Sequence, residues 1–208
     1  IIRGLVGSEM CIRDRSITMA LWGKTDADES KPKWAVRGTG VDPQNIFATA
    51  DGWVLRHYKN ATKTKYWDEI LCSIDGLVGA GGSGTNTLGN ADITAVFFEE
   101  TTYAAAATGT VVVIYNELVD VTNGATLVVT NTTDSASITA TAAAQTGTNR
   151  VEFTFTCAAA SKVHTIGAQT ISGTIVDAGT STASDKVFVL GDTIGAGGSG
   201  STKTITTT

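Results

Sequence analysis

The side chains that could carry out catalysis or bind a metal are few in this sequence, and they are widely separated. The 2 histidines, His57 and His164, have no cysteine, histidine or carboxylate at the spacing that a zinc site requires. No serine occupies the centre of the Gly-x-Ser-x-Gly pattern of a nucleophile elbow. The 3 cysteines, Cys11, Cys72 and Cys157, form no close pair. We expect Cys157, which ends an alternating run, to be a small buried residue.

Acidic side chains offer one further kind of chemistry, that of a catalytic carboxylate pair. Glu99-Glu100, Glu117 and Asp120 supply the carboxylates, but we expect them to be solvated residues of loops and strand ends. The acidic residues also lack the loop spacing of an EF-hand. The sequence therefore predicts a protein that is not an enzyme, with no catalytic residue, no cofactor and no metal site.

Charge and hydropathy restrict the partners. The formal net charge is -5, and no basic residue lies between Lys65 and Arg150. Because Lys and Arg at phosphates supply most of the affinity for nucleic acid, we expect no nucleic-acid partner for this part of the chain. No apolar run is long enough to span a membrane and no signal-peptide segment is seen, so we expect no membrane partner.

The elements that must position these side chains are predicted to be strands, because the chain is rich in Thr, Ala, Gly and Ser and has short β-branched runs. A first run, Val111–Tyr115, leads through a polar corner at Asn116–Glu117 into the alternating Leu118–Val121. The turn Thr122-Asn123-Gly124 then precedes a second run, Leu127–Val129. Asn-Gly between two β-rich runs predicts a hairpin, since both residues tolerate positive φ.

Further runs at similar spacing predict an antiparallel β-sandwich in the C-terminal half. They are Ile93–Phe98, Ser137–Ala142, Arg150–Cys157, Thr165–Val176, Lys186–Leu190 and, as an edge strand, Thr202–Thr207. Most aromatic residues here fall within strand runs, where burial is the default, and Tyr103 is the one we expect to be exposed.

The N-terminal third differs in kind from the rest. Asp42-Pro43 predicts a turn, and Trp53–Tyr58 with Tyr66–Ile74 predicts a β-hairpin. All 4 tryptophans lie in this third, two of them in a segment without helical or strand periodicity that we interpret as an extended arm. We therefore predict an interaction segment whose contact residues are Trp22, Trp34, Trp53 and Trp67. Docking on the same chain and docking on a neighbouring subunit both remain open.

Domain boundaries follow from composition. Gly76–Gly89 is typical of a flexible linker, and its hexamer Gly79–Gly84 recurs at Gly195–Gly200 without the Lys-Ser/Thr of a phosphate-binding loop. We divide the chain into residues 1–18, which we exclude, 19–75 as arm and hairpin, 76–90 as linker, and 91–208 as the sandwich with its Gly-rich C-terminal loop and edge strand.

Residues Ile1 to Arg15 match nothing that follows in composition. The piece VGSEMCIRDR is similar to an in-frame translation of the transposon-end adapter used for shotgun sequencing libraries. A short basic N-terminal arm is the alternative. On the adapter interpretation the natural start is Met19 and Cys11 is not part of the protein.

Two resemblances bear on fold and function. VVVIYNELVDVTNGATLVVT, TGTNRVEFTFT and ISGTIVDAGTST resemble strands of bacterial immunoglobulin-like (Ig-like) domains, which implies an Ig-like sandwich over about half of the chain. MALWGKTDADESKPKW and GWVLRHYKNATKTKYWDEIL resemble the opening of small virion structural proteins of marine tailed bacteriophages. That resemblance implies a particle component of the head, neck or tail.

The sequence therefore predicts an all-β, noncatalytic phage virion protein whose N-terminal segment attaches it and whose Ig-like domain serves display or subunit contact. Its expected partners are other virion proteins, with a homo-oligomer and a host-surface glycan as further options, and its expected location is the virion. The alternative is an Ig-like module for adhesion or carbohydrate binding at the bacterial cell surface.

Overall fold

The computed structural model describes residues 42–49, 52–73, 90–189 and 204–208. They all belong to one compact unit, Trp34–Thr208. Apart from the short 3-10 helix η3 (Pro43–Asn45), the regular elements of the described residues are all strands. The prediction of an all-β chain is confirmed. The predicted arm, most of the linker, Trp22 and Trp34 lie outside the described residues.

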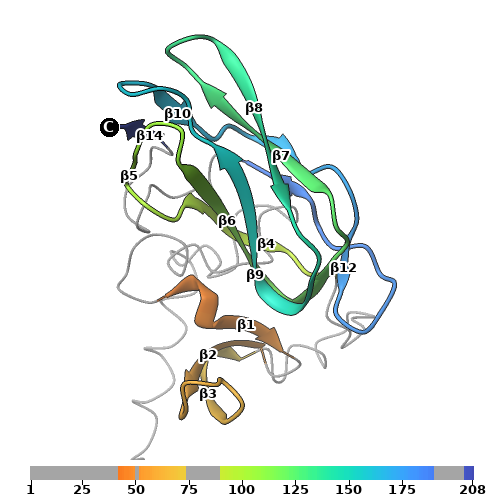
Figure 1. Ribbon diagram of the computed structural model, residues 1–208. Helices are drawn as coiled ribbons and strands as arrows, with labels where there is room; N and C mark the ends of the chain where they lie inside the picture. The colour runs from red at the N-terminus through yellow and green to blue at the C-terminus, as the bar shows by residue number, and fades with distance from the viewer. Residues whose placement is uncertain (1–41, 50–51, 74–89, 190–203) are drawn as a thin grey trace, which may run out of the picture. The chain divides into compact units, whose positions relative to one another are not determined.

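A small antiparallel sheet forms the N-terminal part of the described chain (Figure 1, orange). Its strands β1 (Ile46–Thr49), β2 (Gly52–Tyr58) and β3 (Tyr66–Ser73) are ordered β1-β2-β3, so the predicted β2–β3 hairpin is confirmed. Strand β1 follows the turn predicted at Asp42-Pro43 and was not itself predicted. Its Ile46 and Phe47 are buried, and burial of such a piece is best combined with hydrogen bonding to a neighbouring strand.

The C-terminal part is a larger, curled sheet, antiparallel except where β14 pairs with β5 (Figure 1). Its strands are β4 (Ile93–Phe98), β5 (Thr102–Tyr103), β6 (Thr108–Val121), β7 (Ala125–Asn131), β8 (Ala136–Ala142), β9 (Gln145–Thr156), β10 (Val163–Thr165), β12 (Ile175–Asp177) and β14 (Thr204–Thr207). The order is β12-β6-β9-β8-β7-β10-β14-β5, with β4 on β6. Strands β11 (Gln169–Thr170) and β13 (Val187–Phe188) form a separate pair.

The sheet folds over on itself between β8 and β9, where one residue pair, Thr141 with Thr154, joins the two strands. The core lies between the two halves. Strands β6 and β9 supply Val113, Tyr115 and Phe153 to it, and β7 and β8 supply Leu127 and Ala140, all buried. This arrangement is the sandwich that the alternating runs predicted.

The predicted Asn-Gly hairpin is wrong. The turn at Thr122–Gly124 exists, and Gly124 has φ 90°, but β6 and β7 do not pair, because β9 and β8 lie between them in the sheet. The backbone N–H of Thr122 donates to the Thr174 carbonyl at 3.1 Å, and the N–H of Gly124 donates to the Ala142 carbonyl at 3.0 Å. The turn therefore carries the chain from one half of the sandwich to the other.

The predicted polar corner at Asn116–Glu117 is instead an irregularity inside one continuous strand, where the pairing of β6 with β9 changes register between Ile114 and Val119. Buried Asn116 accepts a hydrogen bond from the Asp92 N–H through its side chain, at 2.7 Å. The amide thereby ties the entry of β4 to β6 where the regular ladder is interrupted.

The close packing of β6 on β9 gives a prediction about Gly109. A Cβ at this position would lie 2.5 Å from Cζ of Phe155 and 3.0 Å from Sγ of Cys157. The Phe155 ring is buried and also packs against Phe98, so it cannot move aside at low cost. Gly109→Ala should lower the free energy of unfolding by roughly 1 to 3 kcal/mol, measured by urea denaturation.

Gly167→Ala is the matched control, because a Cβ there meets nothing within 4 Å. This variant should be neutral or slightly stabilising. Equal unfolding free energies for the two variants would contradict the packing argument.

Candidate functional site

The most unusual surface of the described residues lies on strand β3. Tyr66, Trp67 and Ile70 are exposed to 49%, 48% and 55%, although large apolar side chains are normally buried. Among the described strands β3 pairs with β2 alone, so it is the edge strand of the sheet β1-β2-β3. We call this strand, with its exposed side chains and outer backbone groups, the β3 edge.

One face of the β3 edge is fixed by Arg56 of β2. Its guanidinium forms a two-point ion pair with Asp68, with Nε–Oδ1 at 2.8 Å and Nη2–Oδ2 at 2.9 Å. It also lies over the rings of Tyr66 and Phe47, at 3.9 and 4.3 Å from the centroids. The hydrogen bond that Arg56 donates to Asp68 raises the pKa of Arg56 against the opposing effect of burial. Such a bidentate, stacked arrangement holds Tyr66 in one orientation.

The other face is fixed by His57, which lies opposite Trp67 in the β2–β3 ladder. The two rings stack with centroids 4.2 Å apart and an interplanar angle of 13°. Nε2 of His57 is 2.8 Å from Oε2 of Glu69. The exposed indole is therefore positioned by its cross-strand neighbour, as aromatic pairs in sheets commonly are.

The β2–β3 turn places basic residues beside the start of β3. The side chain of Asn60 accepts a hydrogen bond from the Lys65 N–H at 2.9 Å and donates one to Thr64 at 2.7 Å. The Lys59 N–H closes the loop on the Lys65 carbonyl at 2.8 Å. Lys63 and Lys65 of this turn thus precede Asp68 and Glu69 of β3 along the chain.

Two of the four predicted contact tryptophans are described, and the structure does not bring their side chains to the same kind of place. Trp53 is 2% exposed, whereas Trp67 is half-exposed on the β3 edge. The prediction missed Tyr66, Ile70 and Arg56. Apolar residues on both faces of the predicted strand Tyr66–Ile74 could have indicated Tyr66 and Ile70, because one solvated face is the usual pattern.

The carboxylates weighed for catalysis have separate structural roles. Glu99 is ion-paired with Arg150. Asp120 accepts hydrogen bonds from the backbone of Gly147 at 2.7 Å and of Gly179 at 3.2 Å. Glu117 is half-buried, and it is not paired with Asp120. Burial first, and then the charges of Asp177 and Asp92, raise its pKa to about 7.

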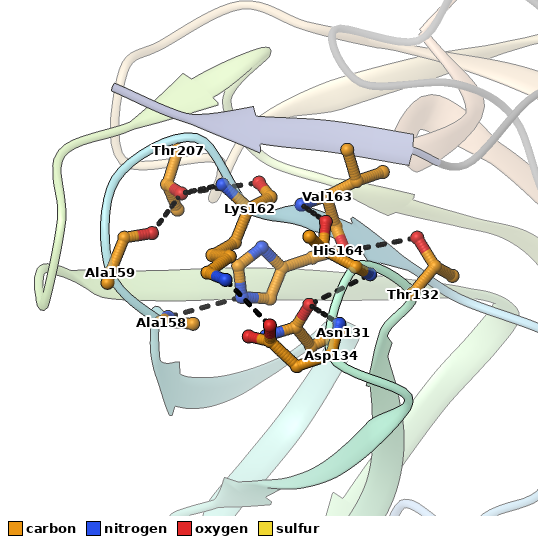
Figure 2. A network of polar contacts seen from close by, with 10 residues as sticks. Asn131, Thr132, Asp134, Ala158, Ala159, Lys162, Val163, His164 and Thr207 are labelled. Atoms are coloured by element: carbon orange, nitrogen blue, oxygen red, sulfur yellow. Dashed lines mark hydrogen bonds and ion pairs between the residues drawn. The ribbon is translucent and has the colours of Figure 1, made fainter.

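His164 is a buried member of a network of polar contacts at the end of the sandwich (Figure 2). Its side chain is fully buried, and its Nε2 accepts a hydrogen bond from the Ala158 N–H at 3.2 Å. Nδ1 has no hydrogen-bond partner in the described residues. Nearby, Asp134 binds Nδ2 of Asn131 at 2.8 Å and Nζ of Lys162 at 2.6 Å, which joins the β7–β8 turn to the start of β10. These contacts hold the β7–β8 turn against the start of β10.

Thr207 completes this end of the sandwich (Figure 2). Its hydroxyl donates to the Ala159 carbonyl at 2.6 Å and accepts from the Lys162 N–H at 3.0 Å. Strand β14 is thereby joined to the β9–β10 loop by side-chain hydrogen bonds as well as by its ladder with β10.

Cys157 is buried and free, as predicted, and burial raises the pKa of its thiol. No group of three His, Cys, Asp or Glu side chains that could hold a metal ion occurs in residues 42–49, 52–73, 90–189 and 204–208. Within the same ranges, no helix has the length and apolar character to cross a membrane. Tyr103, expected to be exposed, is partly buried: its ring packs edge-on against Phe155 and its hydroxyl bonds the Thr110 backbone.

Comparison with known proteins gives no relationship: no family model, no curated protein and no solved structure matches the chain.

The titration of Glu117 leads to a stability prediction. Its carboxyl loses the proton near 4.5 when unfolded and near 7 when folded, so folding is progressively disfavoured as the pH rises between these values. Glu117→Gln keeps the neutral form at every pH. The difference in free energy of unfolding between this variant and wild type should be roughly 1 to 2 kcal/mol more favourable to the variant at pH 8 than at pH 5, after allowance for solvent screening. Urea denaturation at both pH values measures this difference.

Glu100→Gln, at an exposed residue between β4 and β5, is the control and should show the same pH dependence of stability as wild type. A Glu117→Gln protein that loses as much stability as wild type between pH 5 and pH 8 would rule out a buried neutral carboxyl.

His164 should act in the opposite direction. Burial lowers its pKa below the ordinary 6.5, while the Lys162 backbone partly opposes the shift. The unfolded chain therefore takes up a proton before the folded chain does, and stability is lost as the pH falls below about 6.5. In the Glu117→Gln background, which removes the competing titration, His164→Gln should reduce the loss of folding stability below about pH 6.5. NMR titration of the imidazole carbon protons checks the lowered pKa directly, and an ordinary pKa would contradict the prediction.

Proposed function

We propose that this protein is a noncatalytic structural component of a phage virion, a head decoration, neck or tail protein that acts by protein–protein contact. The N-terminal segment, including the β1–β2–β3 sheet, attaches the protein to other virion proteins. The sandwich, which we take to be an Ig-like domain on the resemblance of its strands, is displayed outward or contacts a neighbouring subunit.

The observation that carries the contact role is the β3 edge. It concentrates Tyr66, Trp67 and Ile70 on one strand, and cross-strand contacts with Arg56 and His57 hold the two aromatic rings in place. Rigid exposed aromatic residues beside charged groups are typical of protein interfaces. The virion assignment has separate support, the resemblance of residues 19–77 to small virion proteins.

A surface adhesion or carbohydrate-binding module is the second candidate. It would present an exposed aromatic platform on the sandwich. The exposed large apolar residues of the described sandwich are aliphatic: Leu118, Val128, Val187 and Val189. Tyr103, the aromatic residue best suited to a platform, has its hydroxyl bonded to the backbone of Glu100 and Thr110. These observations favour the assembly role.

The test is peptide mass spectrometry on gradient-purified, virus-sized particles from the sample that carries this gene. Trypsin should release Gly38–Arg56 and Val187–Lys203, one peptide from each part of the chain. We expect both peptides to be enriched with capsid proteins, at a ratio to them that gives the copy number. Peptides confined to the cell-envelope fraction would support the adhesion module, and peptides confined to the soluble cellular fraction would contradict both candidates.

A further inference from the structure

We propose that uptake of a proton by His164 releases strand β14 from the sandwich in mild acid, while the long ladders of the larger sheet remain paired. The inference goes beyond the proposed virion role and does not depend on it, because it concerns hydrogen bonds inside the sandwich. Its basis is the loop of residues 158–162, which bonds to the His164 ring and also holds β14.

The loop bonds to His164 only while the imidazole is neutral. The Ala158 N–H donates to Nε2 at 3.2 Å, so Nε2 carries no proton and the proton of the neutral ring is on Nδ1. The ring is fully buried, and Nδ1 has no hydrogen-bond partner in the described residues. In the protonated ring both nitrogens are donors, so Nε2–H meets the Ala158 N–H and neither group has an acceptor. Buried donors without acceptors are costly, so protonation acts against this arrangement.

The same loop holds β14 through Thr207 (Figure 2). The Thr207 hydroxyl donates to the Ala159 carbonyl at 2.6 Å and accepts from the Lys162 N–H at 3.0 Å. The Thr207 backbone donates to the Lys162 carbonyl at 2.9 Å and accepts from the Ser161 N–H at 2.8 Å. A loop that moves away from His164 therefore also loosens Thr207.

Strand β14 is the part of the larger sheet that can leave at lowest cost. Its ladders contain three residue pairs with β10 and two with β5, whereas seven pairs join β7 to β8. Its one apolar side chain is Ile205, which lies opposite His164 in the β10–β14 ladder. Release therefore exposes far less apolar surface than unfolding of the core does, and such local openings need less free energy than global unfolding.

His164 is the side chain of this network that titrates in mild acid. Strands β7 and β14, which flank β10, bring no titratable side chain to it. Burial raises the pKa of the Cys157 thiol and of the Tyr103 hydroxyl, so both groups stay neutral. The hydrogen bond from Lys162 lowers the pKa of Asp134, which stays ionised. The charge that changes between pH 7.5 and pH 5 is thus on the imidazole.

The direction of the effect follows from linkage. Burial lowers the pKa of His164 below the ordinary 6.5, and contact with water after release restores the ordinary value. The released form therefore takes up a proton before the closed form does. Below about pH 6.5 the released fraction should rise by up to about tenfold for each pH unit.

Native-state hydrogen exchange of the full chain, followed by NMR at pH 7.5 and pH 5, tests the release. Each rate is divided by the intrinsic rate at that pH to give a protection factor. The reporter is the Thr208 N–H, which donates to the Tyr103 carbonyl at 2.9 Å, and the reference is Val113 in the β6–β9 ladder. The Thr208 protection factor should fall roughly tenfold or more at pH 5 and stay well below that of Val113. Low urea should accelerate exchange at Val113 but scarcely at Thr208, because local release exposes little surface.

Three variants separate the proton from the other contacts of β14, with circular dichroism as the check of folding. His164→Gln keeps an acceptor without a titrating ring, so it should remove the pH dependence at Thr208. Thr207→Val removes the buried hydroxyl, so it should lower the Thr208 protection factor roughly tenfold at both pH values. Thr206→Val, at an exposed hydroxyl of the same strand, is the matched control and should leave exchange at Thr208 unchanged.

The inference is overturned by any of three results. The first is a Thr208 protection factor that is equal at pH 7.5 and pH 5 in wild type. The second is an unchanged pH dependence in His164→Gln. The third is equal protection of Thr208 and Val113 at pH 5, which indicates that β14 opens only when the whole sandwich unfolds.

Discussion

The larger sheet depends on the ladder between β6 and its neighbours. Strand β6 pairs with β4, β9 and β12, and its middle residues are buried on both faces of the sheet. Val111, Val113 and Tyr115 enter the main core, while Val112 and Ile114 form a second buried cluster with Ala95 on the opposite face. A strand buried on both faces must be apolar at successive positions, and the run Val111–Tyr115 meets this requirement. The close approach of β9 also explains why Gly109 has no room for a side chain.

Features that depend on local sequence were predictable, and those that depend on distant partners were not. Alternation in Arg150–Cys157 indicated a strand with one buried face, and β9 has that pattern. The Asn-Gly turn was equally local, but a turn does not determine which strands pair. Val121 and Ala125 enter different halves of the sandwich because their neighbours are β12 and β8, which come later in the chain. Only the complete set of strands decides that arrangement.

The same distinction applies to the proposed contact surface. Clustering of tryptophan in the N-terminal third indicated an interaction segment, yet Trp53 and Trp67, both in predicted strands, differ in burial from 2% to 48% exposed. Their difference arises from sheet order: Trp53 is on the central strand and Trp67 on the edge strand. The sequence shows that an aromatic residue is present, whereas its exposure depends on which residues pack around it in the folded chain. Arg56 illustrates the same point, because its partner Asp68 is known only when the register is known.

Polar groups are used differently in the two parts of the chain. In the sandwich, Asn116, Asp120 and Asn131 bond to nearby backbone groups and hold loops to strands, so their hydrogen-bonding capacity is directed inward. On β3, by contrast, Asp68 is ion-paired with Arg56 within the sheet, and the side chains of Tyr66, Trp67 and Ile70 are exposed. Polar contacts in the small sheet thus orient exposed rings, whereas those in the sandwich hold loops to the core.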